Sequence, residues 1–493
     1  MKRIFLSFAV IAAAALSLSA GNNNVRLRFS DGSFKIAQIT DPHWGYGSDT
    51  LAEEKMILKL ISDETPDLII CTGDNVTSAH TLEAGKQMWR HFIGILESTG
   101  IPYAIVQGNH DAESCPGINA DVLEEWISEL APHCLNYPTT SRCFGHGNKT
   151  LPIYSEKGED PAALVYVIDS NDYPRGAENA GLSSYDWIHY DQIEWYRQES
   201  QHYIEANGGK ALPALCFYHI CVPEYDFVAA DRNHFGAYTE KCCPPDINTG
   251  FFAACKMQRD VMAHFVGHDH GNDFCGVYRN VALCYGRQSG AQGLDPNAPM
   301  GIRFIEFNEG ERAFATWIDT MEGREATWYY PSCFNTGILD SAMPAQQISP
   351  KDNGVSYRYF EGGENDLTTK AMNTKKHFKG QGTLNNFNLS AAKVEDHFGF
   401  TFDTCINVPE DEAYCFYVGS DDGSIFSIDG QVLLDQDGDH GQGGQVFVGL
   451  KKGWHTIHID YFENTEGQGI DISYTTLKNQ TRREFSDSEL YVK

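Results

Sequence analysis

The chain has 493 residues, too many for one ordinary hydrophobic core, so two or three domains are expected. Hydrophobic residues make up 42% of it and aromatic residues 12%, which is the composition of a soluble globular protein. The formal net charge of -30 repels phosphate backbones, so the composition argues against stable nucleic-acid binding.

Residues 1–20 predict a secretory signal peptide. Lys2 and Arg3 precede an apolar run from Ile4 to Leu18, and small residues follow as far as Ala20. The run is shorter than the roughly 20 apolar residues that a membrane helix needs. We therefore expect a secreted or periplasmic protein that is cleaved near Ala20 and has no membrane contact afterwards.

Residues 21–335 predict an α/β domain, because short apolar runs alternate with amphipathic helical segments. Strands are expected at 33–40, 66–72, 101–107, 162–169, 212–218 and 261–266. Helices are expected between the strands, including one over residues 185–204.

Polar residues follow the ends of these expected strands. Asp41 and His43 follow 33–40, Asp74 follows 66–72, Asn109, His110 and Asp111 follow 101–107, His219 follows 212–218, and His268 and His270 follow 261–266. The carboxyl ends of strands in α/β folds gather ligands at one edge, and the glycines at 73, 108 and 267 permit tight turns there. Such side chains could hold two metal ions about 3.5–4 Å apart, with one bridging carboxylate.

In this order, the motifs D-x-H, GD, GNHD, a strand-end histidine and GHxH resemble the calcineurin-like metallophosphoesterase superfamily, which includes purple acid phosphatases. The resemblance covers about residues 30 to 320 and implies a β-sandwich flanked by helices. It assigns the ligands as follows: Asp41, His43 and His270 to one metal ion, Asn109, His219 and His268 to the other, and Asp74 to the bridge. His110 would contact the phosphoryl oxygens or protonate the leaving alkoxide, and Asp111 would orient it.

The same resemblance implies hydrolysis of a phosphate ester by metal-activated water, without a protein nucleophile. Purple enzymes have a tyrosine ligand three residues after the bridging aspartate, where this chain has Thr77. We therefore expect a colourless centre of divalent or trivalent ions, with Fe, Mn, Zn and Mg all open as cofactors.

A long irregular segment, residues 220–252, follows His219 and could form a substrate wall. Its side chains that could contact the ester group are Tyr225, Arg232, His234 and Tyr238. A solvated loop explains the segment equally well.

Residues 336–354 are small, polar and interrupted by Pro and Gly, which is typical of a linker. Residues 355–493 alternate apolar and polar positions between Gly/Asp turns and predict an all-β sandwich. Segments 357–363, 398–434 and 449–463 resemble the protective-antigen domain, whose members often bind glycans. Asp421 and Asp422 match a pair that holds calcium in some members, although an Asp-Asp-Gly turn without an ion is the simpler explanation.

Fourteen cysteines in an exported chain predict disulfides. Cys405 and Cys415 flank a turn between two expected strands, where equal offsets from the turn would place them opposite each other.

We therefore expect a secreted di-metal phosphoesterase, most simply a phosphomonoesterase, whose partners are a phosphate ester and, through the second domain, glycans. A phosphodiesterase acting on cyclic or small nucleotides would use the same site. A third hypothesis is a glycan-binding surface protein with an inert phosphatase domain, and the complete set of predicted ligands argues against it.

Overall fold

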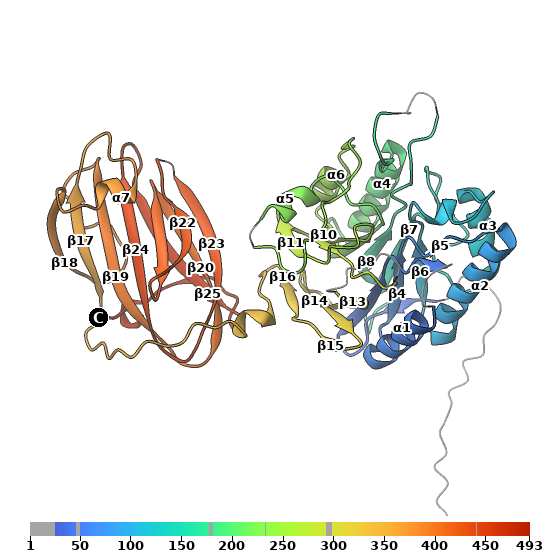
Figure 1. The fold of residues 1–493 in the computed structure, drawn as a ribbon, viewed down its shortest axis with the longest axis horizontal. Helices are drawn as coiled ribbons and strands as arrows, with labels where there is room; N and C mark the ends of the chain where they lie inside the picture. The colour runs from blue at the N-terminus through green and yellow to red at the C-terminus, as the bar shows by residue number, and fades with distance from the viewer. Residues whose placement is uncertain (1–24, 46–49, 177–180, 232, 292–297, 440) are drawn as a thin grey trace, which may run out of the picture.

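The computed structural model describes residues 25–45, 50–176, 181–231, 233–291, 298–439 and 441–493 (Figure 1). The predicted signal peptide and Arg232 therefore lie outside the described residues. An α/β domain, coloured blue to yellow, lies beside an all-β domain in orange and red (Figure 1). Of the helices in the described ranges, none combines the length and apolarity needed to cross a bilayer.

The first domain is built on two sheets. One has the order β15-β14-β13-β2-β4-β6, with β16 beside β14, and the other has the order β1-β7-β8-β9-β10-β12-β11. The strands of the first are β2 (Ser33–Ile39), β4 (Leu68–Thr72), β6 (Tyr103–Val106), β13 (Gly301–Asn308), β14 (Phe314–Thr320), β15 (Gly323–Arg324) and β16 (Trp328–Tyr330). Those of the second are β1 (Leu27–Arg28), β7 (Lys149–Tyr154), β8 (Pro161–Val167), β9 (Ala214–Phe217), β10 (Val261–Val266), β11 (Cys275–Tyr278) and β12 (Val281–Tyr285).

The two sheets pack face to face because each presents an apolar inner face. Ile36 and Val106 from one sheet share a core with Val165 and Phe265 from the other. Helices α1 (Thr50–Glu64), α2 (Leu82–Thr99) and α3 (Ala120–Leu130) cover the outer face of the first sheet. Helices α4 (Tyr190–Ala206), α5 (Tyr225–Ala229) and α6 (Phe251–Gln258) cover that of the second. The predicted β-sandwich flanked by helices is confirmed.

Helix α4 starts later than the sequence pattern predicts. It begins at Tyr190, whereas the aromatic pattern predicts a start at Tyr185. His189 precedes its first turn, and the backbone N–H of His189 donates to Gln192 Oε1 at 2.8 Å, which closes that end of the helix. Residues 185–189 therefore belong to the loop that follows β8.

The second domain is an all-β sandwich, as predicted. One sheet has the order β18-β17-β19-β24-β21-β22, and the other has the order β23-β20-β25-β26. The strands are β17 (Val355–Glu361), β18 (Phe378–Leu384), β19 (Phe398–Val408), β20 (Glu412–Asp421), β21 (Ser424–Ile428), β22 (Gln431–Gln436), β23 (Gln442–Leu450), β24 (Gly453–Glu463), β25 (Gly469–Thr476) and β26 (Arg483–Glu484). Inward-facing aromatic side chains such as Phe400, Phe416 and Tyr461 fill the space between the sheets.

Cys405 and Cys415 do not lie opposite each other. Strand β19 pairs with β17 and β24 in one sheet, whereas β20 pairs with β23 and β25 in the other. Cys405 faces Thr456 across its ladder, and Cys415 faces Phe447. Both are buried free thiols. The predicted hairpin pairing is wrong, because the chain crosses between the sheets at this turn.

The segment predicted as a linker is ordered against the second domain. The backbone N–H of Met343 donates to the carbonyl oxygen of Gly449 at 2.8 Å. The backbone N–H of Gln346 donates to the carbonyl oxygen of Trp454 at 2.7 Å. Just before this segment, the ring of Phe334 meets that of Phe447 at 5.2 Å. The connection between the domains is therefore packed rather than free.

A buried ion pair should make the stability of the second domain depend on pH. His455 Nδ1 lies 2.6 Å from Asp429 Oδ2, and His455 Nε2 lies 2.8 Å from the carbonyl oxygen of Lys451. Burial alone would lower the pKa of His455, but these hydrogen bonds raise it above its ordinary value of 6.5. The stabilisation is therefore fully present below about pH 6.5 and is lost as the pH rises through the folded pKa.

We expect Asp429→Asn to lower the free energy of unfolding by about 3 kcal/mol near pH 6, and by clearly less near pH 10. Hydrogen exchange of a β24 peptide in increasing urea would measure both values. Asp403→Asn removes an exposed partner of His458 and should cost less than about 1 kcal/mol. Equal destabilisation by Asp429→Asn at both pH values would contradict the assignment.

Candidate metal centre

The predicted ligand loops meet at one edge of the first domain. Strands β2, β4 and β6 are parallel neighbours in one sheet, and β9 and β10 are parallel neighbours in the other. Gln38 Nε2 donates to the carbonyl oxygen of Val266 at 3.0 Å, and the backbone N–H of His268 donates to Asp41 Oδ1 at 3.1 Å. These bonds hold the carboxyl ends of the two sets of strands together.

One group of side chains consists of Asp41, His43, Asp74 and His270, whose ligand atoms all lie within 4.8 Å of one another. His43 Nε2 lies 3.0 Å from His270 Nε2 and 3.6 Å from Asp74 Oδ2. His270 Nε2 lies 3.7 Å from Asp41 Oδ1. Imidazole nitrogens and carboxylate oxygens directed at one point form a donor set that suits a transition metal.

The second group consists of Asp74, His219 and His268, again within 4.8 Å. His219 Nε2 lies 3.4 Å from Asp74 Oδ2 and 3.1 Å from Asn109 Oδ1, which adds the amide to this group. Because Oδ2 of Asp74 faces both His43 and His219, this carboxylate lies between the groups, where a bridging ligand must lie. The structure thus brings together all of the predicted metal ligands, in the two sets predicted.

The ring nitrogens of the second group fit a bound cation. His219 Nδ1 faces the carbonyl oxygen of Thr72 at 2.8 Å, so Nδ1 carries the hydrogen and Nε2 is left for the site. Within the described part of the chain, the buried Nε2 of His268 has no hydrogen-bond partner, and burial lowers the pKa of His268 to about 3. A neutral, unpartnered ring nitrogen costs free energy unless a cation takes its lone pair.

The shared carboxylate also requires positive charge nearby. Burial alone would raise the pKa of Asp74, but His219 lowers it well below its ordinary value. Burial alone would have the opposite effect on His219 and lower its pKa, but the negative charge of Asp74 raises that pKa to about 10. Asp74 is therefore a buried anion that needs cationic partners, which two metal ions would provide.

Gly73 and Gly108 let the chain approach these ligands closely. Gly73 has φ +98°, and a Cβ built on it would lie 2.4 Å from His219 Nδ1. A Cβ on Gly108 would lie 2.2 Å from Asp74 Oδ1. Any side chain at either position would displace a ligand.

We expect Gly73→Ala to destabilise the first domain by about 1–3 kcal/mol and to weaken metal binding, because it adds overpacking to backbone strain. Urea unfolding and metal content would measure both effects. Gly94→Ala is the matched control, since Gly94 lies on α2 and its added Cβ would meet no other described segment within 4 Å. That change should stabilise the helix by about 0.5–1 kcal/mol, and similar effects of the two variants would refute the steric argument.

His110 lies at the rim of the first group, its ring centroid 5.5 Å from that of His43. Asp111 does not orient this ring. Asp111 Oδ2 accepts from the backbone N–H of Gly108 at 2.8 Å, and Oδ1 accepts from that of Val76 at 2.9 Å. The predicted orienting role of Asp111 is therefore wrong: its buried carboxylate holds the backbone of the ligand loops.

Glu113 is the carboxylate beside the ring, with Oε1 2.5 Å from His110 Nδ1. Tyr173 Oη lies 3.5 Å from the same Glu113 oxygen and accepts from Asn109 Nδ2 at 3.1 Å. Tyr185 packs edge-on against His268, with ring centroids 4.6 Å apart. These three side chains form an outer ring that the sequence pattern missed.

A signal for two of them was present in the sequence. Tyr173 and Tyr185 lie on the loop after β8, and β8 is parallel to β9, so its carboxyl end reaches the same edge. The rule that polar side chains after strand ends enter the site, applied to 162–169, would have found this loop.

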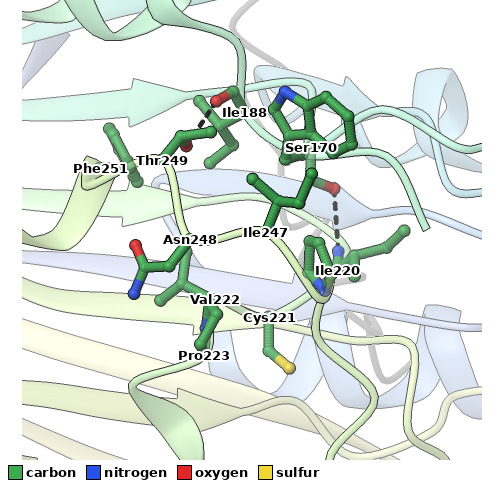
Figure 2. Close-up of a pocket in the computed structure, with 12 residues that line it drawn as sticks. Ser170, Ile188, Ile220, Cys221, Val222, Pro223, Ile247, Asn248, Thr249 and Phe251 are labelled. Atoms are coloured by element: carbon green, nitrogen blue, oxygen red, sulfur yellow. Dashed lines mark hydrogen bonds between the residues drawn. The ribbon is translucent and has the colours of Figure 1, made fainter. Parts of the chain in front are cut away.

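The backbone after His219 is fixed by the contacts in Figure 2. Ser170 Oγ accepts from the backbone N–H of Ile220 at 2.9 Å, and Thr249 Oγ1 donates to the carbonyl oxygen of Ile188 at 2.7 Å. The cavity between them, of about 10 Å³, has room for about one water molecule. It therefore supports the His219 loop and is too small for a substrate.

The predicted substrate wall is only partly available to a ligand. Tyr225 is fully buried, and its hydroxyl donates to the carbonyl oxygens of His264 and Cys284, so Tyr225 packs the core, contrary to the prediction. His234 and Tyr238 lie beside the segment that follows His270, with Tyr238 bridged to Asn272. Substrate contact by these two stays a prediction.

In the second domain, Asp422 is buried and its Oδ2 accepts from the backbone N–H of Asn464 at 2.8 Å. The described ranges contain no third group of three His, Cys, Asp or Glu ligands as compact as the two above. Calcium binding by Asp421 and Asp422 stays a prediction.

Comparison with known proteins identifies both domains. Residues 34–272 match the model of calcineurin-like phosphoesterases, and residues 352–487 match the PA14 domain. Probable inactive purple acid phosphatase 29 of Arabidopsis thaliana is 30% identical over 313 residues, which cover 57% of this chain and 78% of that protein. The chain belongs to the calcineurin-like phosphoesterase family. Both resemblances predicted from the sequence are confirmed.

Two further relatives of this chain have names that differ on activity. Probable inactive purple acid phosphatase 14 of Arabidopsis thaliana is 28% identical over 354 residues, covering 64% of this chain and 86% of that protein. Phosphatase DCR2 of Saccharomyces cerevisiae is 28% identical over 331 residues, covering 59% of this chain and 54% of that protein. Family membership therefore does not decide whether this chain hydrolyses a substrate.

Proposed function

We propose that this phosphoesterase is an exported di-metal phosphomonoesterase. The observation that carries the proposal is the convergence of its predicted ligands into two groups that share Asp74. Two bound metal ions would supply charge neutralisation of the ester and a water of lowered pKa as nucleophile. Export rests on the pattern of residues 1–20.

The side chains of the chain itself have distinct tasks. One ion would be held by Asp41, His43 and His270. The other would be held by Asn109, His219 and His268, and Asp74 would bind both ions. His110 has Nδ1 against Glu113, so Nε2 is the nitrogen that faces the substrate and can give a proton to the leaving oxygen. Its half-exposed position at the rim suits a group that meets the ester rather than a metal ion.

Two other functions compete with this one. A phosphodiesterase on cyclic or small nucleotides would use the same metal centre. An inert domain beside a glycan-binding module gains weight from the relatives named inactive, but the complete ligand set speaks against it. Glycan binding by the PA14 domain rests on the family resemblance, and a glycan array probed with the full chain would test it.

The deciding experiment is hydrolysis of an aryl phosphomonoester and an aryl phosphodiester by the full chain, metal-loaded and chelated. We expect monoester turnover that chelation abolishes and metal restores. Asn109→Ala should lower kcat/KM by about 10²–10³-fold and reduce bound metal. Asn308→Ala, the same change at an exposed position, is the control.

Diester turnover alone would make the phosphodiesterase the better function. Absence of turnover on both esters, with two metal ions bound, would favour the inert domain.

A further inference from the structure

A cavity of about 280 Å³ lies beside the metal centre. Its wall includes Gly108, which is the residue before the ligand Asn109, and Asp172, which precedes Tyr173. Tyr173 Oη accepts from Asn109 Nδ2 at 3.1 Å, so the cavity and the metal centre share these two stretches of chain as walls. The size is close to the lower end of small-molecule sites, about 300–1,000 Å³.

One side of the cavity is aromatic. Phe144 lines it, and the ring of Phe144 stacks on that of His189 with centroids 4.1 Å apart and planes 8° apart. His189 stacks in turn on Trp187 at 5.8 Å. The side chain of Phe144 remains 42% exposed, so its ring is accessible to a ligand. The stack therefore holds a rigid apolar ring at the cavity, where the ring of a ligand can pack on it.

The wall also carries charged side chains, and its cations are already paired. Arg175 Nη2 lies 2.6 Å from Asp172 Oδ2. His146 Nδ1 lies 3.4 Å from Glu124 Oε2, and the hydrogen bond to Glu124 raises the pKa of His146. Asp121 lies near the other nitrogen of His146, at 3.6 Å. With more carboxylates than cations, this wall disfavours a second anionic group on a ligand.

Neutral hydroxyl groups fit this wall better than charged groups do. A hydroxyl donates to a carboxylate such as Asp172 and accepts from a guanidinium such as that of Arg175. Several hydroxyls on a saturated ring could use these partners while the ring packs on Phe144. A planar base carries fewer hydroxyls than a saturated sugar ring and therefore makes fewer of these paired contacts with Asp172 and Arg175.

We propose that this cavity is the leaving-group subsite and that it takes the ring of a hexose phosphate. This inference rests on the proposed phosphomonoesterase function and adds its substrate class. The phosphate would lie at the metal centre, and the sugar would extend past Asn109 and Tyr173 into the cavity.

The test compares kcat and KM of the metal-loaded full chain on a hexose 6-phosphate, glycerol 3-phosphate, a nucleoside 5′-monophosphate and p-nitrophenyl phosphate. We expect the hexose phosphate to exceed glycerol phosphate by about tenfold or more in kcat/KM. Phe144→Ala should raise KM for the hexose phosphate by about tenfold, with little change in kcat or in either parameter for glycerol phosphate. Phe227→Ala, at an exposed phenylalanine stacked on Tyr278, is the matched control.

Other outcomes overturn the inference in recognisable ways. Equal effects of Phe144→Ala and Phe227→Ala, or a preference for the nucleotide, would show that the cavity does not take a sugar ring. If p-nitrophenyl phosphate is not hydrolysed at all, the proposed phosphomonoesterase function is refuted, and the kinetic comparison no longer tests the cavity. Saturation-transfer NMR with free hexose then decides the cavity alone: binding lost in Phe144→Ala supports it, and no binding to the wild-type chain refutes it.

Discussion

Asp74→Asn should lower kcat/KM by at least about a thousandfold and reduce the metal content to one ion or none per chain. Asp74 Oδ2 lies 3.6 Å from His43 Nε2 and 3.4 Å from His219 Nε2, so this oxygen faces both groups. An asparagine keeps the shape but loses the negative charge that offsets the repulsion between two cations. Elemental analysis of the purified variant, together with turnover of an aryl phosphate, measures both effects.

The control for this change is Asp260→Asn. Asp260 is also buried in the first domain, where it accepts from the hydroxyls of Tyr166 at 2.8 Å and Tyr196 at 2.6 Å. The Asp260→Asn change should lower the free energy of unfolding and leave the metal content unchanged. If Asp74→Asn retained both ions and full turnover, Asp74 would not bridge.

Glu113→Gln should slow the proposed hydrolysis only for esters with poor leaving groups. Glu113 Oε1 lies 2.5 Å from His110 Nδ1 and so sets the direction of the ring. An alkoxide needs a proton as it leaves, whereas p-nitrophenolate leaves unaided. We expect kcat to fall by about 10- to 100-fold on an alkyl phosphate and by less than about threefold on p-nitrophenyl phosphate.

Steady-state kinetics on a series of esters with leaving groups of increasing pKa tests this prediction. The slope of log kcat against that pKa should be steeper in Glu113→Gln than in the wild-type chain. Glu125→Gln on the exposed face of α3 is the matched control. A uniform loss across the series would instead indicate general damage to the site, and no loss would mean that Glu113 does not position His110.

The sequence by itself determined which side chains gather at the candidate metal centre, and it determined the fold class. Each ligand follows directly after an apolar strand, and the carboxyl ends of parallel strands share an edge whatever the rest of the chain does. Asn109 and His219 therefore meet at 3.1 Å although 110 residues separate them. The alternation in residues 355–493 likewise determined a β-sandwich, because its period of two is a local property.

Only the tertiary structure decided which neighbours support those ligands. Asp111 and Glu113 both follow His110 closely, and the short helical turn η1 (Asp111–Glu113) directs Asp111 into the core and leaves Glu113 beside the ring. Which side chain reaches which partner depends on backbone direction at a turn, and no hydrophobic period encodes that direction.

The same reason separates Cys405 from Cys415. Their spacing suits a hairpin, but the apolar faces of β19 and β20 are buried on opposite sides of one core, so the chain changes sheet at the turn. The cavity beside Asn109 is also a product of tertiary structure, because its walls come from loops after β6 and β8 and from the segment at Phe144. A candidate ligand can be recognised from the few residues that follow a strand. A cavity, in contrast, forms only when segments far apart in the sequence pack together.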